Sequence, residues 1–361
     1  MRRSILLITT LILLVNACTS KQSTPTLTAA PTPITVTDAL GRQVTLPSAP
    51  QRIVITGKAL FMIIDAVYTF PDARDRIVGM GSADQGISNF ISLIDPQYSQ
   101  KAVLESGAGA EQIAALKPDL VILKSYLAES VGTPIEAIGI PVIYVDFETP
   151  EQYTRDLTIL GQALQMEARA AELNAYYQAK IDSINKAVAS VTEKPRILML
   201  SYSDKDGTVA FKVPPLSWMQ TQIVQMAGGE PVWGNANLSN NWTQVTLEQI
   251  AAWNADQIFV ISYNSNSADV VTRLKANSTW QQLRAVQESK LYAFPGDLYS
   301  WDQPDTRWIL GLTWLAGCLH PEQFSDMNII TEAQTFYQTL YGLDNTFFEK
   351  NIRPTFKGNI P

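Results

Sequence analysis

The stretch Glu111-Gln-Ile-Ala-Ala-Leu-Lys-Pro-Asp119 decides the fold, because it returns later as Glu248-Gln-Ile-Ala-Ala-Trp-Asn-Ala-Asp256. Each copy leads into an apolar run, Leu120–Leu123 in the first and Gln257–Ile261 in the second. A helix that breaks briefly before a buried strand is half of an α/β unit. Alone, the phrase is also simply a good start for an amphipathic helix. Solenoid repeats recur every 20–50 residues or so, whereas these copies lie a domain's length apart, so two similar lobes are indicated.

Short apolar runs alternate with helical patterns on either side of the chain's middle, which predicts an α/β fold of two Rossmann-like lobes with mainly parallel sheets. Helices are expected at Trp218–Gly228 and Leu247–Ala252. The expected strands are Arg52–Thr56, Ile77–Gly81, Leu120–Leu123 and Val142–Asp146 in the first lobe, and Arg196–Tyr202, Gln257–Tyr263 and Leu291–Phe294 in the second.

One long helix is expected between the lobes, over Thr149–Val191. Leu157, Leu160 and Leu164 recur there at helical spacing, and strong helix formers fill the rest. At 1.5 Å per residue such a helix would reach about 60 Å and pass from one lobe into the other. The expected organisation is an N-terminal lobe at 34–150, a connecting helix at 151–193 and a C-terminal lobe at 194–361. A continuous helix also predicts little lobe movement.

The N-terminus predicts export and a lipid anchor. A basic start is followed by the apolar run Ile5–Val15 and then by Ala17-Cys18. A run of eleven residues is too short for a comfortable membrane span but suits a secretory signal. The position of Cys18 resembles a bacterial lipoprotein cleavage box, which implies a signal peptide at 1–17 and a lipid on Cys18; an ordinary secreted protein is the alternative. Residues 18–33 are rich in Ser, Thr, Ala and Pro, which indicates a disordered tether.

Nearly the whole mature chain resembles the ABC-importer substrate-binding lipoproteins for iron–siderophores, haem and cobalamin. The resemblance rests on Val36-Thr-Asp-Ala-Leu-Gly-Arg-Gln-Val-Thr45, on Pro50-Gln-Arg-Ile-Val54, and on the helix-then-strand phrase in each lobe. It covers Thr35 to about Asp326. It implies two lobes joined by one long backbone helix, and permease docking through Glu111 and Glu248. Local chemistry is the alternative for these glutamates, because a Glu in a first helical turn favours the helix dipole and Thr246 with Gln249 fits a capping box.

The ligand is expected in the loops that follow the strands, because ligands of open α/β sheets bind at the carboxyl ends of strands. The loop Asp297–Asp305 and the residues just after it are the richest in chemistry, since they offer aromatic faces, carboxylates and the guanidinium of Arg307. Trp301 is preferred there over Trp308, which starts an apolar helix. The candidate ligand-binding residues are Lys58, Ser82, Lys124, Tyr126, Trp242, Tyr299, Trp301, Asp302 and Arg307.

Structural roles remain open for several of these side chains. Arg307 could equally form an ion pair with Asp302 or Asp305 that fixes the loop. Lys58 could be a solvated surface lysine, and Lys124 and Tyr126 could pack their own loop.

Composition excludes several classes of function. Lys and Arg total 27 against 34 Asp and Glu, a net charge of −7, and there is no basic run, so nucleic acid is not an expected partner. The single histidine, His320, leaves too few ligands for a bare zinc site and is expected to end a helix. We find no nucleophile elbow and no Walker loop, so the chain is not expected to be an enzyme and no cofactor is expected.

With this N-terminus and these loops, the resemblance implies an extracytoplasmic, lipid-anchored monomer that captures a metal chelate, such as an iron–siderophore, for the permease subunits of an ABC importer. The alternatives are an oxyanion such as molybdate or tungstate, or a corrinoid, bound by the same fold. A surface lipoprotein with no transport role is a third reading.

Overall fold

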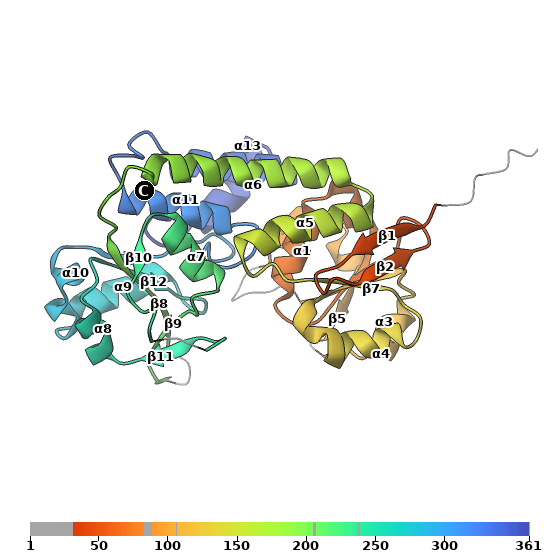
Figure 1. The fold of residues 1–361 in the computed structure, drawn as a ribbon, viewed down its shortest axis with the longest axis horizontal. Helices are drawn as coiled ribbons and strands as arrows, with labels where there is room; N and C mark the ends of the chain where they lie inside the picture. The colour runs from red at the N-terminus through yellow and green to blue at the C-terminus, as the bar shows by residue number, and fades with distance from the viewer. Residues whose placement is uncertain (1–31, 83–88, 106, 205–206, 237–238, 361) are drawn as a thin grey trace, which may run out of the picture. The chain divides into compact units, whose positions relative to one another are not determined.

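The computed structural model describes residues 32–82, 89–105, 107–204, 207–236 and 239–360. The signal peptide, Cys18 and the tether up to residue 31 lie outside these residues. Residues 33–361 form one unit with two α/β lobes (Figure 1). The N-terminal lobe holds a five-stranded parallel sheet in the order β5-β4-β3-β6-β7, preceded by an antiparallel hairpin. The sheet strands are β3 (Ile53–Ile55), β4 (Ile77–Gly81), β5 (Ala102–Leu104), β6 (Leu120–Lys124) and β7 (Val142–Val145), and the hairpin is β1 (Ile34–Thr37) with β2 (Gln43–Leu46).

The C-terminal lobe has a mixed sheet in the order β11-β9-β8-β12-β13, with β10 also paired to β8. β8, β10, β12 and β13 are parallel, whereas β9 and β11 add an antiparallel edge. The strands are β8 (Arg196–Ser203), β9 (Ala210–Val213), β10 (Glu230–Pro231), β11 (Thr243–Val245), β12 (Gln257–Ile261) and β13 (Leu291–Ala293). All seven expected strands are confirmed, most with slightly shifted ends, and the antiparallel edge was not expected.

Helices cover both sheets. The first lobe has α1 (Leu60–Tyr68), α2 (Phe90–Ile94), α3 (Ala110–Ala115) and α4 (Thr133–Glu136). The second has α7 (Met219–Met226), α8 (Leu247–Trp253), α9 (Ser267–Ala276), α10 (Arg284–Gln287), α11 (Trp308–Leu319), α12 (Ile329–Tyr341) and α13 (Asn345–Phe347). His320 is the C-cap residue of α11, as expected.

The repeated phrase folds the same way in both lobes. The amides of Gln51 and Arg52, just before β3, donate to the Asp119 carboxylate, and the amide of Arg196 donates to Asp256 at the start of β8. The break before each strand also matches, since Lys117 and Asn254 both adopt positive φ, at 50° and 44°. The sequence repeat is therefore a structural repeat: helix, left-handed turn, and an aspartate that fixes the neighbouring strand.

The expected single helix over Thr149–Val191 is wrong in its extent. It is two helices, α5 (Pro150–Leu164) and α6 (Glu167–Val188), which pack on each other. Gln165 between them has φ 59°, and a Cβ on Gly161 would lie 2.4 Å from the Cβ of Ala170, so the chain reverses where glycine permits close approach. The connecting element is α6 alone, about 33 Å long at 1.5 Å per residue.

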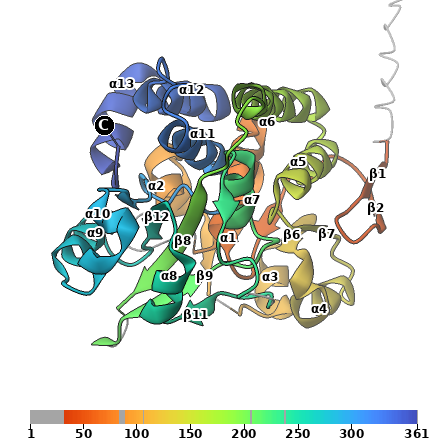
Figure 2. The ribbon, with the colours of Figure 1, turned by 60° about the vertical axis from the view of Figure 1, so that its left-hand side comes forward.

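Helix α6 binds both lobes, and Figure 2 shows it beside α11 and α12. Arg169 at its start donates to the Thr69 carbonyl of the first lobe and to the Leu340 carbonyl of the second. Tyr177 donates to the Thr306 carbonyl at 2.8 Å and stacks on Trp308. The apolar core continues through this helical layer, so the lobes share a buried cluster rather than a thin linker. The expected small lobe movement remains a prediction.

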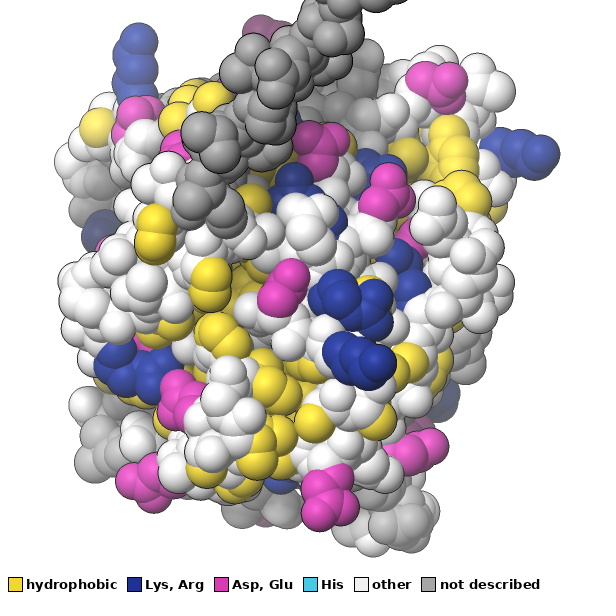
Figure 3. Space-filling view, turned by 90° about the vertical axis from the view of Figure 1, so that its right-hand side faces the viewer, with side chains coloured by type: hydrophobic (Ala, Val, Ile, Leu, Met, Phe, Trp, Pro, Cys, Tyr) yellow, Lys and Arg dark blue, Asp and Glu magenta, His cyan; other side chains and the backbone are white. Residues whose placement is uncertain are grey.

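Acidic and basic side chains are interspersed on the face of the first lobe shown in Figure 3. Within the described ranges, none of the helices combines the length and apolarity needed to cross a bilayer.

Candidate functional site

A cleft of about 610 Å³ receives side chains from both lobes. The first lobe contributes residues that follow its strands, and the second contributes most of the aromatic surface. The lining residues are Ala59, Met62, Tyr126 and Glu148 from the first lobe, and Trp218, Gln220, Asn240, Asn241, Trp242, Tyr263, Gln303 and Pro304 from the second. Cavities of this size suit small organic ligands, which occupy about 300–1,000 Å³.

Aromatic rings form one wall of the cleft. Trp242 meets Trp218 edge to face at 5.8 Å between ring centroids, and Tyr263 at 6.3 Å. Trp242 directly precedes β11, Tyr263 follows β12, and Trp218 caps α7. On the opposite lobe Tyr126 follows β6 and is 58% exposed. Such exposure is unusual for a large ring within a cleft and leaves it available to a flat ligand face.

An ion pair between Lys124 and Glu148 supports the wall of the first lobe. The Lys124 ammonium, at the end of β6, donates to the Glu148 carboxylate at 2.6 Å and approaches the Met62 sulfur at 3.4 Å. Its side chain is buried, whereas Glu148 is partly exposed to the cleft. Lys124 therefore packs the loop from behind, and the alternative of a direct ligand contact is not supported. What reaches the cleft is a carboxylate.

Asp302 supports the opposite wall from behind. Its carboxylate accepts hydrogen bonds from Tyr263 at 2.6 Å, Gln220 at 3.2 Å and Ser300 at 2.5 Å, and it is fully buried. Burial raises the pKa of Asp302, while these donors lower it. The expectation that Asp302 touches ligand is corrected, because two side chains that do line the cleft stand in front of it.

Arg307 and Trp301 are also corrected. Arg307 is fully buried and bonds Asp65, Asp297 and Asp305 at 2.5, 2.9 and 3.1 Å. The Trp301 indole N–H donates to Asp297 at 3.0 Å, and its ring is fully buried. The ion-pair reading of Arg307 thus holds with respect to Asp305, not Asp302, and the network also includes Asp65 of the other lobe.

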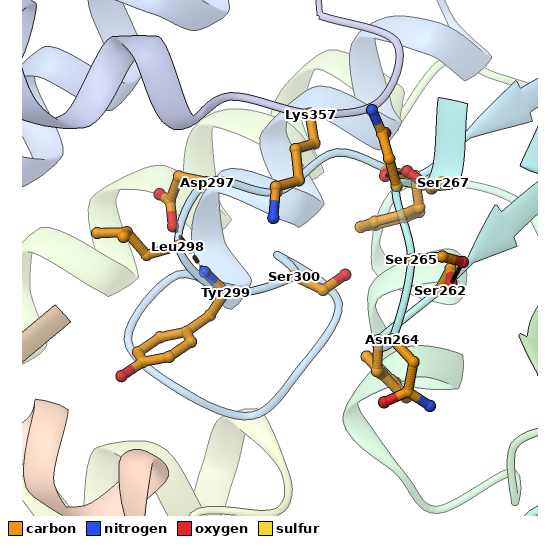
Figure 4. A pocket seen from close by; sticks show the side chains of 13 residues that line it. Ser262, Asn264, Ser265, Ser267, Asp297, Leu298, Tyr299, Ser300 and Lys357 are labelled. Carbon is orange, nitrogen blue, oxygen red and sulfur yellow. Dashed lines mark hydrogen bonds between the residues drawn. The ribbon is translucent and has the colours of Figure 1, made fainter. Parts of the chain in front are cut away.

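The remaining candidates fall at different places. Trp242 and Tyr126 line the cleft. Lys58 and Ser82 are exposed but do not line it, although Ala59 next to Lys58 does. Tyr299 is almost fully buried, accepts a hydrogen bond from the Phe90 amide, and borders a separate pocket of the second lobe (Figure 4).

Sequence reasoning missed Trp218, Met62, Gln220 and Glu148. Glu148 follows β7 by three residues, so the rule of strand ends applied to it as well. Trp218 and Gln220 stand at the start of a helix, and Met62 lies in the first turn of α1, positions that no strand-end rule selects.

The two glutamates proposed for docking lie on equivalent helices, α3 and α8. Both are exposed in the first turn. The helix before a parallel strand runs against it, so each N-terminus lies level with the carboxyl ends of the strands, on the side of the cleft. The expected capping box is confirmed, since Thr246 and Gln249 exchange hydrogen bonds with each other's amides. Hydrogen bonds from its own backbone N–H and from Thr246 lower the pKa of Glu248.

Across the described part of the chain, no group of three or more His, Cys, Asp or Glu side chains could hold a metal ion.

Comparison with known proteins agrees with this fold. The family described as periplasmic binding protein matches residues 75–298, more than half of the chain. The molybdate-binding protein MolA of Haemophilus influenzae is 24% identical over 332 residues, covering 85% of this chain and 90% of that protein. A vitamin B12-binding protein of Yersinia pseudotuberculosis is 26% identical over 236 residues, covering 60% and 79%.

An uncharacterized ABC transporter substrate-binding lipoprotein of Bacillus subtilis, YvrC, is 22% identical, covering 81% of this chain and 88% of that protein. Among solved structures, a periplasmic solute binding protein from Veillonella parvula superposes with a TM-score of 0.70 at 23% identity, over 90% of this chain and 100% of that one. MolA bound to molybdate gives 0.70 at 21% identity, over 86% and 98%. The chain belongs to the periplasmic binding protein family and is the extracytoplasmic substrate-binding component of an ABC importer, not an enzyme.

Proposed function

We propose that this protein captures a bulky, uncharged or cationic metal–organic complex, a corrinoid or a metal chelate, in the cleft between its lobes. The observation that carries the proposal is the lining of the cleft. Two tryptophans and two tyrosines offer flat apolar faces, and the charged side chain among the lining residues is the carboxylate of Glu148. Aromatic faces suit the organic shell of such a complex, whereas an exposed carboxylate disfavours an anion.

The proposed ligand contacts follow from the same lining. Tyr126 lines the cleft from the first lobe and Trp242 from the second, with Trp218 and Tyr263 extending the second wall. Lys58 is retained as a peripheral candidate beside Ala59. The corrinoid reading is further supported by the vitamin B12-binding relative, which aligns with this chain over 79% of its own length.

An oxyanion is the second candidate, because a molybdate-binding relative aligns over most of this chain. The cleft argues against it. Oxyanions are recognised by Arg, Lys or backbone N–H donors, and the lining residues of the cleft include no Arg or Lys. Lys124, which lies behind the wall of the cleft, is already paired with Glu148.

We further propose that Glu111 and Glu248 dock onto arginines of the permease and that a lipid on Cys18 keeps the protein at the membrane. Support for docking is the equivalent, exposed placement of the two glutamates on the cleft side of each lobe. Support for the lipid is the sequence before Cys18, together with a relative that is named a lipoprotein.

The test is a titration of the purified mature chain, in which tryptophan fluorescence and calorimetry measure ligand binding. The panel is cyanocobalamin, haem, a ferric hydroxamate siderophore, molybdate and tungstate. Saturable binding of one metal–organic complex, with quenching of tryptophan emission, is expected. Saturation by molybdate or tungstate alone, lost in Trp242→Ala, would replace the proposal with the oxyanion reading.

A further inference from the structure

We propose that the second lobe carries a separate site for a small oxyanion, in the pocket closed by Lys357 of the C-terminal tail (Figure 4). The pocket holds about 220 Å³ and is lined by the loops after β12 and β13 together with Lys357. At about 30 Å³ per water molecule, this is room for a small ion and a few waters, not for a chelate. The proposal does not depend on the ligand of the cleft.

The position of Lys357 is fixed by its backbone. Its amide donates to the Gly296 carbonyl at 2.8 Å, and the Gly296 amide donates back at 3.2 Å. The next residue, Gly358, has φ 84°, and a Cβ there would lie 2.6 Å from the Phe294 carbonyl oxygen, so only glycine fits. Asn359 then exchanges hydrogen bonds with the backbone of Ala293. These hydrogen bonds hold the tail against the end of β13 and the loop that follows it. The backbone of Lys357 is therefore fixed at the pocket.

Lys357 also carries the unneutralised charge of the pocket. Among the described residues its ammonium makes no ion pair and no hydrogen bond, and Figure 4 shows it pointing into the space beside Ser300. The other charged lining residue, Asp297, is saturated elsewhere. Its carboxylate accepts hydrogen bonds from the Tyr299 amide, Arg307, the Trp301 indole and the Tyr337 hydroxyl.

Two neutral groups of the pocket add donors beside the ammonium, whereas Ser267 and Ser300 keep only acceptor lone pairs. Ser267 and Ser300 already give their hydroxyl hydrogens to the Phe294 carbonyl and to Asp302. Ser262 and Ser265 bond each other at 2.8 Å, which leaves one hydroxyl hydrogen between them. The Asn266 side-chain oxygen accepts from the Ala268 amide, so its NH₂ group remains as a donor.

An ammonium beside an amide NH₂ group and one hydroxyl hydrogen suits an oxyanion, such as phosphate, molybdate or a carboxylate. This is the chemistry that the cleft lacks. Lys357 lies beyond residues 75–298, the part of the chain that matches the family, so the tail adds the charge to loops that the family domain supplies.

The experiment is calorimetric titration of the full mature chain with inorganic phosphate, molybdate and acetate. Lys357→Gln should weaken binding of the anion that the wild type prefers by at least about tenfold, and Lys357→Arg should restore most of the affinity. Lys350→Gln, which removes an exposed lysine from the same tail segment, is the matched control and should leave the titration unchanged. Unchanged melting temperatures show that the variants are folded.

Three outcomes overturn the site: no saturable heat with any of the three anions, equal affinity in Lys357→Gln and the wild type, or equal loss in Lys350→Gln. Trp242→Ala separates this site from the cleft. Anion binding lost in Trp242→Ala but kept in Lys357→Gln would place the anion in the cleft, which contradicts this inference and supports the oxyanion importer instead. Failure of cyanocobalamin or a siderophore to bind tests the cleft alone.

Discussion

The Arg307 guanidinium lies 2.5 Å from the Asp65 carboxylate, and both side chains are fully excluded from solvent. Asp65 belongs to α1 of the first lobe and Arg307 to the loop before α11 of the second, so this pair joins the lobes directly. Asp297 and Asp305 complete the ion-pair network. The guanidinium also lies over the rings of Phe90, at 4.4 Å, and Tyr299, at 4.9 Å.

Replacing Arg307 should destabilise the protein strongly. Arg307→Met leaves three buried carboxyl groups without their cation, and breaking a buried pair in this way costs about 3–5 kcal/mol. Urea unfolding followed by circular dichroism measures the loss. Arg353→Met is the matched control, because its ion pair with Glu349 is exposed and is worth at most about 1 kcal/mol. Similar losses in the two variants would show that the network contributes little.

The carboxyl of Asp65 should make stability depend on pH. Burial raises its pKa to about 6, against the opposing attraction of Arg307. A folded pKa above the unfolded value of about 3.9 stabilises the folded state fully below about pH 4. This contribution is lost as pH rises through about 6. Asp65→Asn removes the titration, so the wild type should lose stability relative to this variant between about pH 4 and 6.

Unfolding midpoints of both proteins across that range check the prediction. The groups that face Asp65 are the same in both proteins: Arg307, Asp297, Asp305, Tyr299 and Tyr341. The charge of Asp65 also raises the pKa of Asp305, so the difference between the two profiles reports the titration of this buried network, with Asp65 as the group removed. Parallel pH profiles of the wild type and Asp65→Asn would contradict the assignment.

The two-lobed fold could be predicted from the sequence because the ends of strands and the repeated phrase are marked by residues that are close together in the chain. Asp119 and Asp256 could be paired as equivalents before any geometry was known, and both cap the adjacent strand in the same way. The break at Gln165 was not visible, since a left-handed residue between two good helices leaves the apolar spacing almost intact.

The site was predicted less well, for a physical reason. Side chains in polar loops can point either into the protein core or into the cleft, and the sequence does not say which of the two directions each one takes. Arg307 and Trp301 turn inward because their partner Asp297 is buried with them, and because Asp65, 242 positions away from Arg307, completes the pair. Trp242 and Tyr126 point into the cleft. Both lie just outside a strand, so the in-and-out alternation of strand residues does not fix the direction of their side chains.

Truncating Trp242 should weaken ligand binding. Losing the contact of one large aromatic face costs about 1.5–3 kcal/mol, which is roughly tenfold to hundredfold in affinity. Trp253→Ala is the matched control, because Trp253 is likewise half-buried but lies outside the cleft. Calorimetry with whichever complex the panel identifies measures both variants. Equal affinity in Trp242→Ala and the wild type would remove this residue from the proposed contacts.

Reversing the two exposed glutamates should separate capture from delivery. Glu111→Lys with Glu248→Lys places cations where arginines of the permease are proposed to bind, so uptake by cells that carry the importer should be abolished. Neither residue lines the cleft, so ligand affinity should stay within about threefold, or about 0.65 kcal/mol. Glu193→Lys is the control, since this exposed glutamate precedes β8 at the opposite edge of its sheet. Uptake that continues in the double variant at the rate of Glu193→Lys would assign both glutamates to helix capping alone.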